Sequence, residues 1–488
     1  MGADTTSLLS SDSKHGINGM NHSLDEAVVI TDEKSHTANL LSPAVVDERR
    51  LVSKLDRYIV PIMTLTYILS FLDRSNIGNA KLMHLEKDLD ISQAGYSWGL
   101  SIFFVGYILL EVPANIVMKL WRPSQWLGLI VFGWGVLCTC MAANTGLVSL
   151  LTLRFLLGAF EAGFVPGVIY YFTLWYTPDE ICSRIGWLFT AVPVAGACGG
   201  LLAYAVSFMD GLHGIAAWQW LFLIEGLPTV VMGIIIFFFM PNSAYQASWL
   251  TPEEQQRVQQ RLERRHGVDA STQGLNKAQV REAFKEFTTY IYGACLFGFG
   301  TAAYGNSFLM STVIKELGFN DIIAQLLTVP PYVGAAIYMV LMCYHAGRVH
   351  KFGLHIIVSA AGGLVGFILI AFVHGRVGQY LSLTLAVITI FTGAPLLMGW
   401  MSNNTVGSTK IAVVTSLITS IGNLGGLVAG QMYRNSEAPQ YLVSHLVNAG
   451  CLLSAIILVL WLCYIYTEKN KRLETESLAN GKPFRYTL

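Results

Sequence analysis

The sequence predicts an all-α membrane protein in which twelve transmembrane helices form two pseudo-symmetric bundles of six. Of its 488 residues, 53% are hydrophobic and only 13% are charged, whereas a soluble globular protein carries about a quarter charged residues. Because the charged residues are so few, the chain has too little polar surface to face water. Lipid must therefore be the solvent for most of it. Apolar windows of about 20 residues, the length that spans a bilayer as a helix, recur in two sets with a long polar segment between them.

The first set lies near 58–79, 95–119, 125–144, 147–172, 185–208 and 217–240, and the second near 287–312, 322–345, 354–373, 379–401, 408–432 and 443–466. Six plus six windows around a polar segment are typical of a transporter built from two halves. We therefore expect an N-terminal bundle over 54–240 and a C-terminal bundle over 287–467, in a chain that acts as a monomer.

Three segments outside the windows are polar. Residues 1–53 show no apolar core of a signal peptide and are expected to form a disordered tail. Residues 468–488 form a second tail, and the segment 241–286 links the bundles. In that linker, Thr251-Pro252-Glu253-Glu254 places Thr at the N-cap, Pro at the first helical position and Glu at the third. This capping box predicts a short surface helix.

Lysine and arginine residues predict the orientation. Arg74 and Arg154 fall inside apolar windows, which leaves 29 of the 31 basic residues. With the N-terminus in the cytosol, 24 of these 29 face the cytosol, and the outer loops hold only Lys81, Lys87, Lys315, Arg376 and Arg434. The positive-inside rule therefore predicts that both tails and the linker are cytosolic. We expect the membrane to be the plasma membrane.

Two charged residues share one face of the fourth window. Arg154 and Glu161 are seven residues apart, and seven steps of about 100° end roughly 20° short of two full turns. A charge at membrane depth costs several kcal/mol unless it faces a polar cavity or a partner. We expect both side chains to line one cavity, and the alternative is a structural charge pair that holds the N-terminal bundle together.

A second group of charges ends the first window, where Asp73-Arg74 is followed by Asn76 and Asn79 at helical spacing. We expect Asp73 and Arg74 to face the same cavity. The alternative is that both reach the outer interface, where long polar side chains extend to water.

Three further charged residues are assigned structural or gating roles. Glu111 precedes Pro113 near the inner end of the second window, and Glu225 lies in the middle of the sixth. Arg184 follows Glu180 between the fourth and fifth windows, where a gate or packing role is expected.

The signs of these charges predict proton-coupled symport of a small organic anion. Desolvation favours the neutral form of a carboxyl group, so Asp73 and Glu161 are expected to load and release protons. An arginine keeps its charge and presents a forked donor that fits a carboxylate. A cavity whose arginines hold the anion and whose acids hold protons approaches neutrality and can reorient. Sodium as the coupling ion stays open, because a carboxylate can bind either cation.

Other classes of function find little support in the sequence. The eight cysteines include no CxxC spacing and no neighbouring His cluster, so we expect neither a disulfide framework nor a metal. The chain has no nucleotide-binding loop and no nucleophile constellation, so we expect no enzyme activity and no cofactor. A formal net charge of +0 gives no reason to expect a nucleic-acid partner.

An ordered series of motifs over about 54–432 resembles the anion:cation symporter family of the major facilitator superfamily, in the allantoate and nicotinate permease branch best known from fungi. The series comprises Lys54-Leu55-Asp56, Phe71-Leu72-Asp73-Arg74-Ser75-Asn76-Ile77-Gly78-Asn79-Ala80, Gly106-Tyr107, Glu111-Val112-Pro113-Ala114-Asn115, Arg154-Phe155, Gly158, Glu161-Ala162-Gly163, Pro166-Gly167, Trp220-Leu221-Phe222, Glu225-Gly226, Gln325-Leu326-Leu327 and Pro330-Pro331-Tyr332.

This resemblance implies the major facilitator fold and roles for specific residues. In such proteins the acids matching Asp73 and Glu161 and the arginines matching Arg74 and Arg154 serve proton coupling and anion binding. The resemblance also suggests three neutral substrate contacts, at Tyr107, Asn404 and Asn423. Taken by itself, Asn423 in Gly422-Asn423-Leu424-Gly425-Gly426 could equally be a packing residue between helices.

The chain departs from the family pattern in its loops. Gly347 stands where the family has an acid before Arg348, Ile411 stands where an arginine follows Thr409-Lys410, and Lys119-Leu120-Trp121-Arg122 lacks the acidic gate residue of many facilitators. We assign Arg348 a gating or structural role. These changes suggest a divergent member whose substrate need not match those of the better-known members.

Two other functions are considered. A proton-linked exporter of a secondary metabolite or another organic acid is the first, but the stretch Gly196-Ala197-Cys198-Gly199-Gly200 lacks the proline that drug exporters carry there. A nutrient sensor that does not transport is the second, and nothing in the linker or tails exceeds ordinary linker composition.

Overall fold

The computed structural model describes residues 48–266, 277–405, 407–433, 437–438, 441–480 and 486–487. The chain divides into two compact units, Met1–Tyr58 and Ile59–Leu488. The described part of the first unit, residues 48–58, is helical. Most of the expected N-terminal tail, residues 1–47, lies outside the described residues, as do Arg434 and the middle of the linker. The architecture below concerns the second unit.

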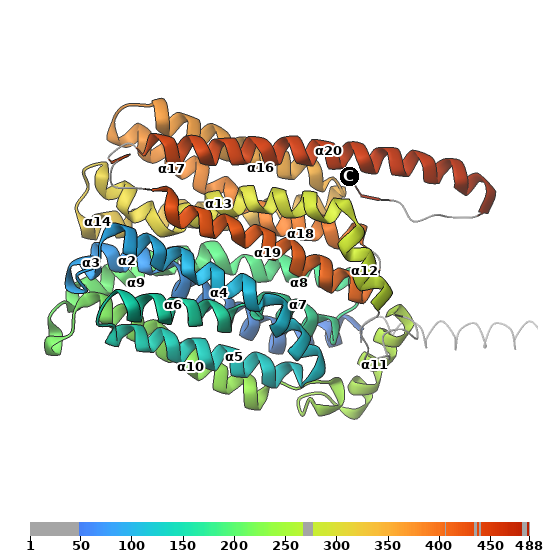
Figure 1. Cartoon of the computed structure of the whole chain (residues 1–488). Helices are drawn as coiled ribbons and strands as arrows, with labels where there is room; N and C mark the ends of the chain where they lie inside the picture. The colour runs from blue at the N-terminus through green and yellow to red at the C-terminus, as the bar shows by residue number, and fades with distance from the viewer. Residues whose placement is uncertain are drawn as a thin grey trace, which may run out of the picture. The chain divides into compact units, whose positions relative to one another are not determined.

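The described residues contain helices and no strand. In the N-terminal half these are α2 (Ile77–Leu82), α3 (Leu85–Asp88), α4 (Gln93–Leu120), α5 (Pro123–Cys140), α6 (Leu147–Glu161), α7 (Phe164–Thr173), α8 (Pro178–Phe189), α9 (Ala191–Val206) and α10 (Ala217–Phe239). In the C-terminal half they are α13 (Phe287–Glu316), α14 (Asp321–Leu326), α15 (Val329–Val349), α16 (Phe352–Phe372), α17 (Arg376–Ile390), α18 (Gly393–Asn404), α19 (Ser408–Met432) and α20 (Leu442–Asn480). The linker contains α11 (Pro252–His266) and α12 (Lys277–Lys285). The long helices of the two halves run side by side (Figure 1).

The expected membrane spans are present as helices. Eleven helices of the described chain are long and apolar enough to cross a membrane, the first of them Glu48–Leu82. The seventh expected window coincides with α13, which has 30 residues and is not among those eleven. It packs against α19 and α20 as a full member of the C-terminal half. The predicted fold class of two six-helix bundles is therefore confirmed.

Four of the interrupted spans in the described chain restart with a proline in the first turn of the new helix. The restarting helices are α7, α9, α15 and α18, which place Pro166, Pro193, Pro330 and Pro395 within their first three residues. Proline has no N–H to donate to the preceding turn, and the first turn of a helix is the place where that loss costs nothing. At these four restarts the proline therefore breaks no helical hydrogen bond, whereas Pro113 and Pro228 lie inside the continuous helices α4 and α10.

Glycine residues allow the helices of each half to approach closely. A Cβ on Gly158 of α6 would lie 1.9 Å from the Phe103 carbonyl oxygen of α4, and one on Gly106 of α4 would lie 2.2 Å from the Phe155 oxygen. Both helices therefore pack backbone to backbone, as small residues permit in membranes. Within the C-terminal half, α13 packs on α19 and α16 on α17 and α20.

Contacts between the halves occur at both ends of the bundle. The linker end, where α11 and α12 lie, has α8 against α18 and α7 against α19. At the opposite end, which carries α2, α3 and α14, α2 contacts α13 and α9 contacts α14 and α15. The α4 helix lies along α19, where Ser101 donates to the Leu427 carbonyl at 2.9 Å and Asn115 to Ser416 Oγ at 3.4 Å.

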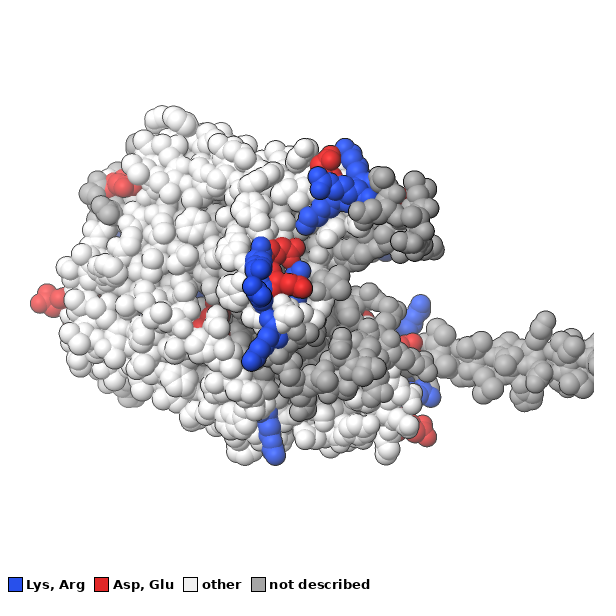
Figure 2. All heavy atoms as spheres, turned by 45° about the vertical axis from the view of Figure 1, so that its right-hand side comes forward, with Lys and Arg blue, Asp and Glu red and all other residues white. Residues whose placement is uncertain are grey.

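Charged side chains are few on the flanks of the helices and gather toward the linker end, which comes forward in Figure 2. The predicted capping box is formed there: the Thr251 N–H donates to Glu254 Oε2 at 2.9 Å and the Glu254 N–H to Thr251 Oγ1 at 3.3 Å. The surface helix predicted for the linker is α11.

The last described residues of the chain return to the tenth span. Thr487 donates its N–H to Asn404 Oδ1 at 2.8 Å, and its carbonyl accepts from Trp400 Nε1 at 2.8 Å and Asn404 Nδ2 at 3.1 Å. Next to it, Tyr486 exchanges two hydrogen bonds with Asn470 of α20. The Asn404 side chain therefore anchors the C-terminal segment to the linker end of α18.

We expect Gly158→Ala to destabilise the protein. Overpacking typically costs about 1–3 kcal/mol, and here the new methyl group would meet a backbone carbonyl that has no flexible end to move aside. The matched control is Gly450→Ala on α20, where a Cβ meets nothing within 4 Å and Ala favours the helix by about 1 kcal/mol. Thermal unfolding of the two variants in detergent checks this, and equal melting temperatures would contradict the packing argument.

We expect Asn404→Ala to release the C-terminal segment without disturbing the bundle, because the amide makes three hydrogen bonds to Thr487. Carboxypeptidase should then remove the last residues at least several-fold faster than in the unaltered protein. Ser402→Ala on the same helix, whose hydroxyl bonds only the Gly399 carbonyl, should leave the digestion rate unchanged. Equal rates for Asn404→Ala and the unaltered chain would show that these bonds do not hold the segment.

Candidate functional site

A cavity lies between the two halves, and the empty space in and around it, which includes open solvent, amounts to about 760 Å³. Its walls come from the first, second, fourth, fifth, seventh, tenth and eleventh spans. The residues that line it are Tyr67, Phe71, Arg74, Tyr107, Val165, Phe189, Val192, Leu296, Phe299, Gly300, Ala303, Tyr304, Ile390, Phe391, Ala394, Met398, Thr419, Gly422 and Asn423. Three of the span interruptions, before α7, α9 and α18, fall at this level, because Val165, Val192 and Ala394 belong to the restarting turns.

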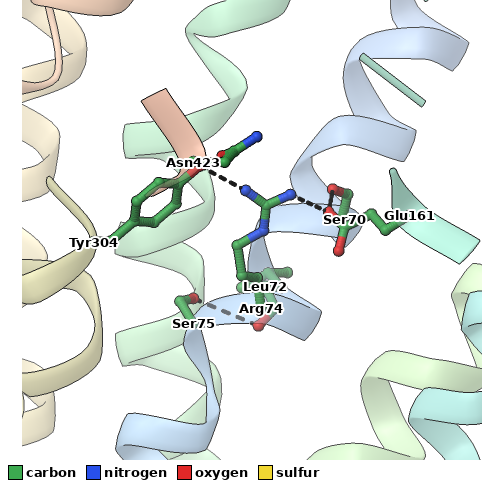
Figure 3. Close-up of polar contacts among 7 residues, drawn as sticks. All are labelled: Ser70, Leu72, Arg74, Ser75, Glu161, Tyr304 and Asn423. Carbon is green, nitrogen blue, oxygen red and sulfur yellow. Dashed lines mark hydrogen bonds and ion pairs between the residues drawn. The ribbon is translucent and has the colours of Figure 1, made fainter. Parts of the chain in front are cut away.

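Arg74 is the charged residue of this cavity. Among the described residues that line it, Arg74 alone carries a charge, and it is only 4% exposed. Its Nη2 contacts Glu161 Oε1 at 2.6 Å and its Nη1 donates to Tyr304 Oη at 2.8 Å, so the guanidinium lies between the two halves (Figure 3). The rings of Phe103, Tyr107 and Tyr304 surround it, with centroids 5.1, 5.2 and 5.6 Å from Cζ.

Glu161 balances this charge with one oxygen. Its Oε1 accepts hydrogen bonds from both Arg74 and Ser70, whereas its Oε2 is buried and has no partner among the described residues. Glu161 is the last residue of α6, so its side chain leaves the helix at the interruption of the fourth span. The carboxylate therefore lies behind Arg74 as seen from the cavity. One of its oxygens accepts hydrogen bonds, and the other is buried and keeps its capacity to accept one.

A short relay joins the guanidinium to the C-terminal half. The Tyr304 hydroxyl of α13 accepts from Arg74 and donates to Asn423 Oδ1 of α19 at 2.9 Å. Tyr304 is not among the site residues predicted from the sequence. The available signal was a tyrosine between Ala303 and Gly305 inside an apolar window, because a buried phenol hydroxyl needs a hydrogen-bond partner.

Asp73 points away from the cavity. Its Oδ1 accepts from the Cys138 thiol of α5 at 3.2 Å, and its Oδ2 accepts from Thr229 Oγ1 of α10 at 3.3 Å. Adjacent residues on a helix are rotated by about 100°, so Asp73 and Arg74 point in different directions. Asp73 is buried within the N-terminal half and is absent from the cavity lining.

Arg154 lies with Asp73. It is 1% exposed, and its Nε and Nη2 have no partner among the described residues. Asp73 and Glu161 are both near enough to act on it electrostatically, and Asp73 and Arg154 both act on Glu225. Both carboxylate oxygens of Glu225 are buried without a hydrogen-bond partner in the described chain. Asp73, Arg154 and Glu225 thus form a second charged cluster, the inner cluster, within the N-terminal half.

The expectation that two acids and two arginines line one hollow is met only in part. Arg74 lines the cavity and Glu161 reaches it through Arg74, whereas Asp73 and Arg154 belong to the inner cluster. Seven residues separate Arg154 from Glu161 on α6, about 10 Å along the helix axis. That distance places Arg154 beyond the cavity although both residues share a helix face.

Of the three neutral residues suggested by the resemblance, two line the cavity and one does not. Tyr107 lines the cavity with its ring against Arg74, and Asn423 lines it as the acceptor of the relay. Asn404 does not line it, because its amide holds Thr487 at the linker end. Among the described residues, no group of three or more His, Cys, Asp or Glu could hold a metal ion.

The residues assigned to gating or structure lie at several contacts. Glu111 of α4 accepts from Ser420 Oγ of α19 at 2.6 Å, which joins the two halves. Arg184 donates to the Glu180 carbonyl at 2.9 Å and covers the Tyr176 ring at 4.9 Å. Arg348, which is exposed, covers the ring of Tyr344 on its own helix at 4.5 Å.

Residues 63–430 match the sequence profile of the Major Facilitator Superfamily. The chain is 34% identical over 454 residues to the MFS transporter prlL of a fungal species, covering 90% of this chain and 91% of prlL. It is 32% identical to the putative metabolite transport protein NicT of Pseudomonas putida, over 84% of this chain and 94% of NicT.

A solved structure shows the same fold. A bacterial homologue of the human lysosomal transporter Spinster, in an inward-facing and occupied conformation, superimposes with a TM-score of 0.58 at 15% identity, over 83% of this chain and 95% of the homologue. Fold, profile and relatives agree over most of the chain. The chain therefore belongs to the major facilitator superfamily of membrane transporters.

Proposed function

We propose that this chain is a secondary active transporter that moves a small organic anion together with protons by alternating access. The observation that carries the proposal is that Arg74, the charged residue of the cavity lining, is balanced by a single carboxylate, Glu161. The resemblance of the Asp73-Arg74 and Arg154 to Glu161 segments to the anion:cation symporters supports the same roles.

Glu161 and the substrate anion would compete for Arg74, and this competition would couple binding of the anion to binding of a proton. A guanidinium presents paired N–H groups that fit one carboxylate in a forked geometry, and here Nη2 is occupied by Glu161. A proton on Glu161 removes the charge that holds Arg74 and leaves the guanidinium free for a substrate anion. A buried guanidinium without any anion is costly, so the unloaded cavity favours an ionised Glu161.

Alternating access would separate the contacts at one end of the bundle at a time. Opening at the linker end breaks the contacts of α8 with α18 and of α7 with α19, and opening at the other end breaks those of α2 with α13 and of α9 with α15. Arg74 touches both halves through Glu161 and Tyr304, so the charge state of the cavity bears on either movement. Glu111 and Ser420 form a further link between the halves.

Asp73 is the second acid of the proposal and acts from the inner cluster. A change in its charge is felt by Arg154 and Glu161 across low-dielectric protein, without contact with the substrate. We place both tails and the linker in the cytosol and the protein in the plasma membrane. The direction of net transport follows the gradients, and export of an organic acid is the alternative that the same fold allows.

Uptake into proteoliposomes tests the coupling. When the solution outside the vesicles is more acidic than the solution inside, the protein should accumulate a labelled organic anion from a panel of carboxylates. A protonophore should abolish this accumulation. Accumulation driven only by a sodium gradient would contradict proton coupling, and uptake of none of the panel would contradict an organic anion as the substrate.

Replacing Glu161 by Gln should separate exchange from coupling. The amide has the shape of the protonated acid but cannot ionise, so exchange of preloaded substrate should continue while gradient-driven accumulation falls by about tenfold or more. Glu253→Gln, on the exposed surface of α11, is the matched control and should change neither activity. Gradient-driven accumulation that survives in Glu161→Gln would make Glu161 a structural residue.

Replacing Arg74 by Lys should weaken substrate binding while keeping the charge. Lysine lacks the forked donor, and loss of one charge-assisted hydrogen bond costs about 1.5–3 kcal/mol, so we expect the KM of uptake to rise by roughly tenfold or more. Arg281→Lys on α12, whose side chain is exposed, serves as the control. An unchanged KM in Arg74→Lys would remove Arg74 from the binding site.

A further inference from the structure

From the lining of the cavity we infer the class of substrate: an organic anion with one negative charge and a flat, mainly apolar body, such as an aromatic monocarboxylate. The inference rests on the proposed function, because it takes the cavity around Arg74 as the substrate site. It goes further by excluding di- and tricarboxylates, phosphorylated compounds and polyhydroxy acids as preferred ligands.

The charge of the lining sets the charge of the ligand. Arg74 is the charged member of the described lining, and no Lys or His of the described chain joins it there. An anion bound to Arg74 satisfies the one positive charge. A second carboxylate on the same molecule would be buried without a cation, which costs several kcal/mol. A dianion is therefore a poor ligand even when its size fits.

The walls set the shape of the ligand. Aromatic rings come from both halves: the Phe71 and Phe391 centroids are 6.5 Å apart in an edge-on arrangement across the halves, and Tyr67 and Phe189 are edge-on at 5.9 Å. Phe299 and Met398 complete the apolar wall on the C-terminal side. Edge-on and offset contacts between rings contribute about 0.5–1.5 kcal/mol beyond their burial, so a flat ring is favoured over an aliphatic chain of similar size.

The hydrogen-bonding groups set a limit on the polarity of the ligand. Asn423 Oδ1 already accepts from Tyr304, and the Thr419 hydroxyl already donates to the Thr415 carbonyl. The remaining polar groups of the lining side chains besides Arg74 are the Asn423 Nδ2 group, which can only donate, and phenol hydroxyls. A ligand with several hydroxyl groups would leave water and find too few acceptors, and each unpaired polar group costs about 1–3 kcal/mol.

Binding to the purified full-length protein tests this class. Calorimetric titration at mildly acidic pH compares benzoate with hexanoate, terephthalate, gluconate and benzamide. We expect benzoate to bind about threefold to tenfold more tightly than hexanoate and at least about a hundredfold more tightly than terephthalate or gluconate. Benzamide, which has the ring but no charge, should not bind measurably. Terephthalate or gluconate binding as tightly as benzoate would overturn the inference.

A wall variant tests the aromatic preference. Phe391→Leu should lower benzoate affinity by about threefold to tenfold and leave hexanoate affinity unchanged. Phe238→Leu is the matched control, because Phe238 is 73% exposed on α10 and outside the lining; it should change neither affinity. Melting temperatures of both variants show whether each is folded. An equal loss of affinity for both ligands in folded Phe391→Leu would contradict recognition of the ring.

The outcomes separate this inference from the proposed function, because titration needs no gradient. If benzoate binds with the stated preference but no proton gradient drives its uptake, the substrate class stands and the coupling mechanism falls. If a proton gradient drives uptake of a dicarboxylate or sugar acid instead, the coupling stands and the substrate class is wrong.

Discussion

The buried guanidinium of Arg74 constrains the rest of this structure. A charged group that is 4% exposed in a membrane bundle must find compensation from its neighbours. Glu161 and Ser70 supply it from the N-terminal half, and Tyr304 supplies a hydroxyl from the C-terminal half. Because those partners come from both halves, the arrangement around one cation depends on how the halves are positioned, and a ligand that changes the partners would change the preferred position.

The space around that cation follows from interruptions of the surrounding helices. Helices α7, α9 and α18 restart in the middle of their spans with a proline in the first turn, and the turns at those restarts help to line the cavity. Irregular backbone is tolerated at membrane depth where it borders such a cavity. Backbone contacts at Gly158 and Gly106 hold α4 and α6 closely together beside it, so Tyr107 on α4 and Glu161 on α6 reach Arg74 from neighbouring helices.

The buried charges of the N-terminal half form two clusters with different surroundings. Around Arg74 the charges adjoin a cavity and engage both halves, whereas in the inner cluster Asp73, Arg154 and Glu225 are enclosed in the N-terminal half. Several polar atoms of the inner cluster have no hydrogen-bond partner in the described chain. Such a cluster is sensitive to the charge of each member, because electrostatic interactions act over longer distances where water is excluded. Communication between the groups would pass through Asp73 and Arg74, which adjoin on one helix.

The sequence by itself determined that lipid surrounds most of the chain, where the twelve spans lie and which residues carry charge into the membrane. Those features follow from composition, from window length and from the cost of burying Arg74, Glu161 and Glu225, all of which are local properties. Helical periodicity could not decide which opening each side chain faces, since that depends on the helices packed around it. Only the tertiary structure placed Asp73 and Arg154 in the inner cluster and the Asn404 side chain against Thr487. It also brought Tyr304, 230 residues away in sequence, to Arg74.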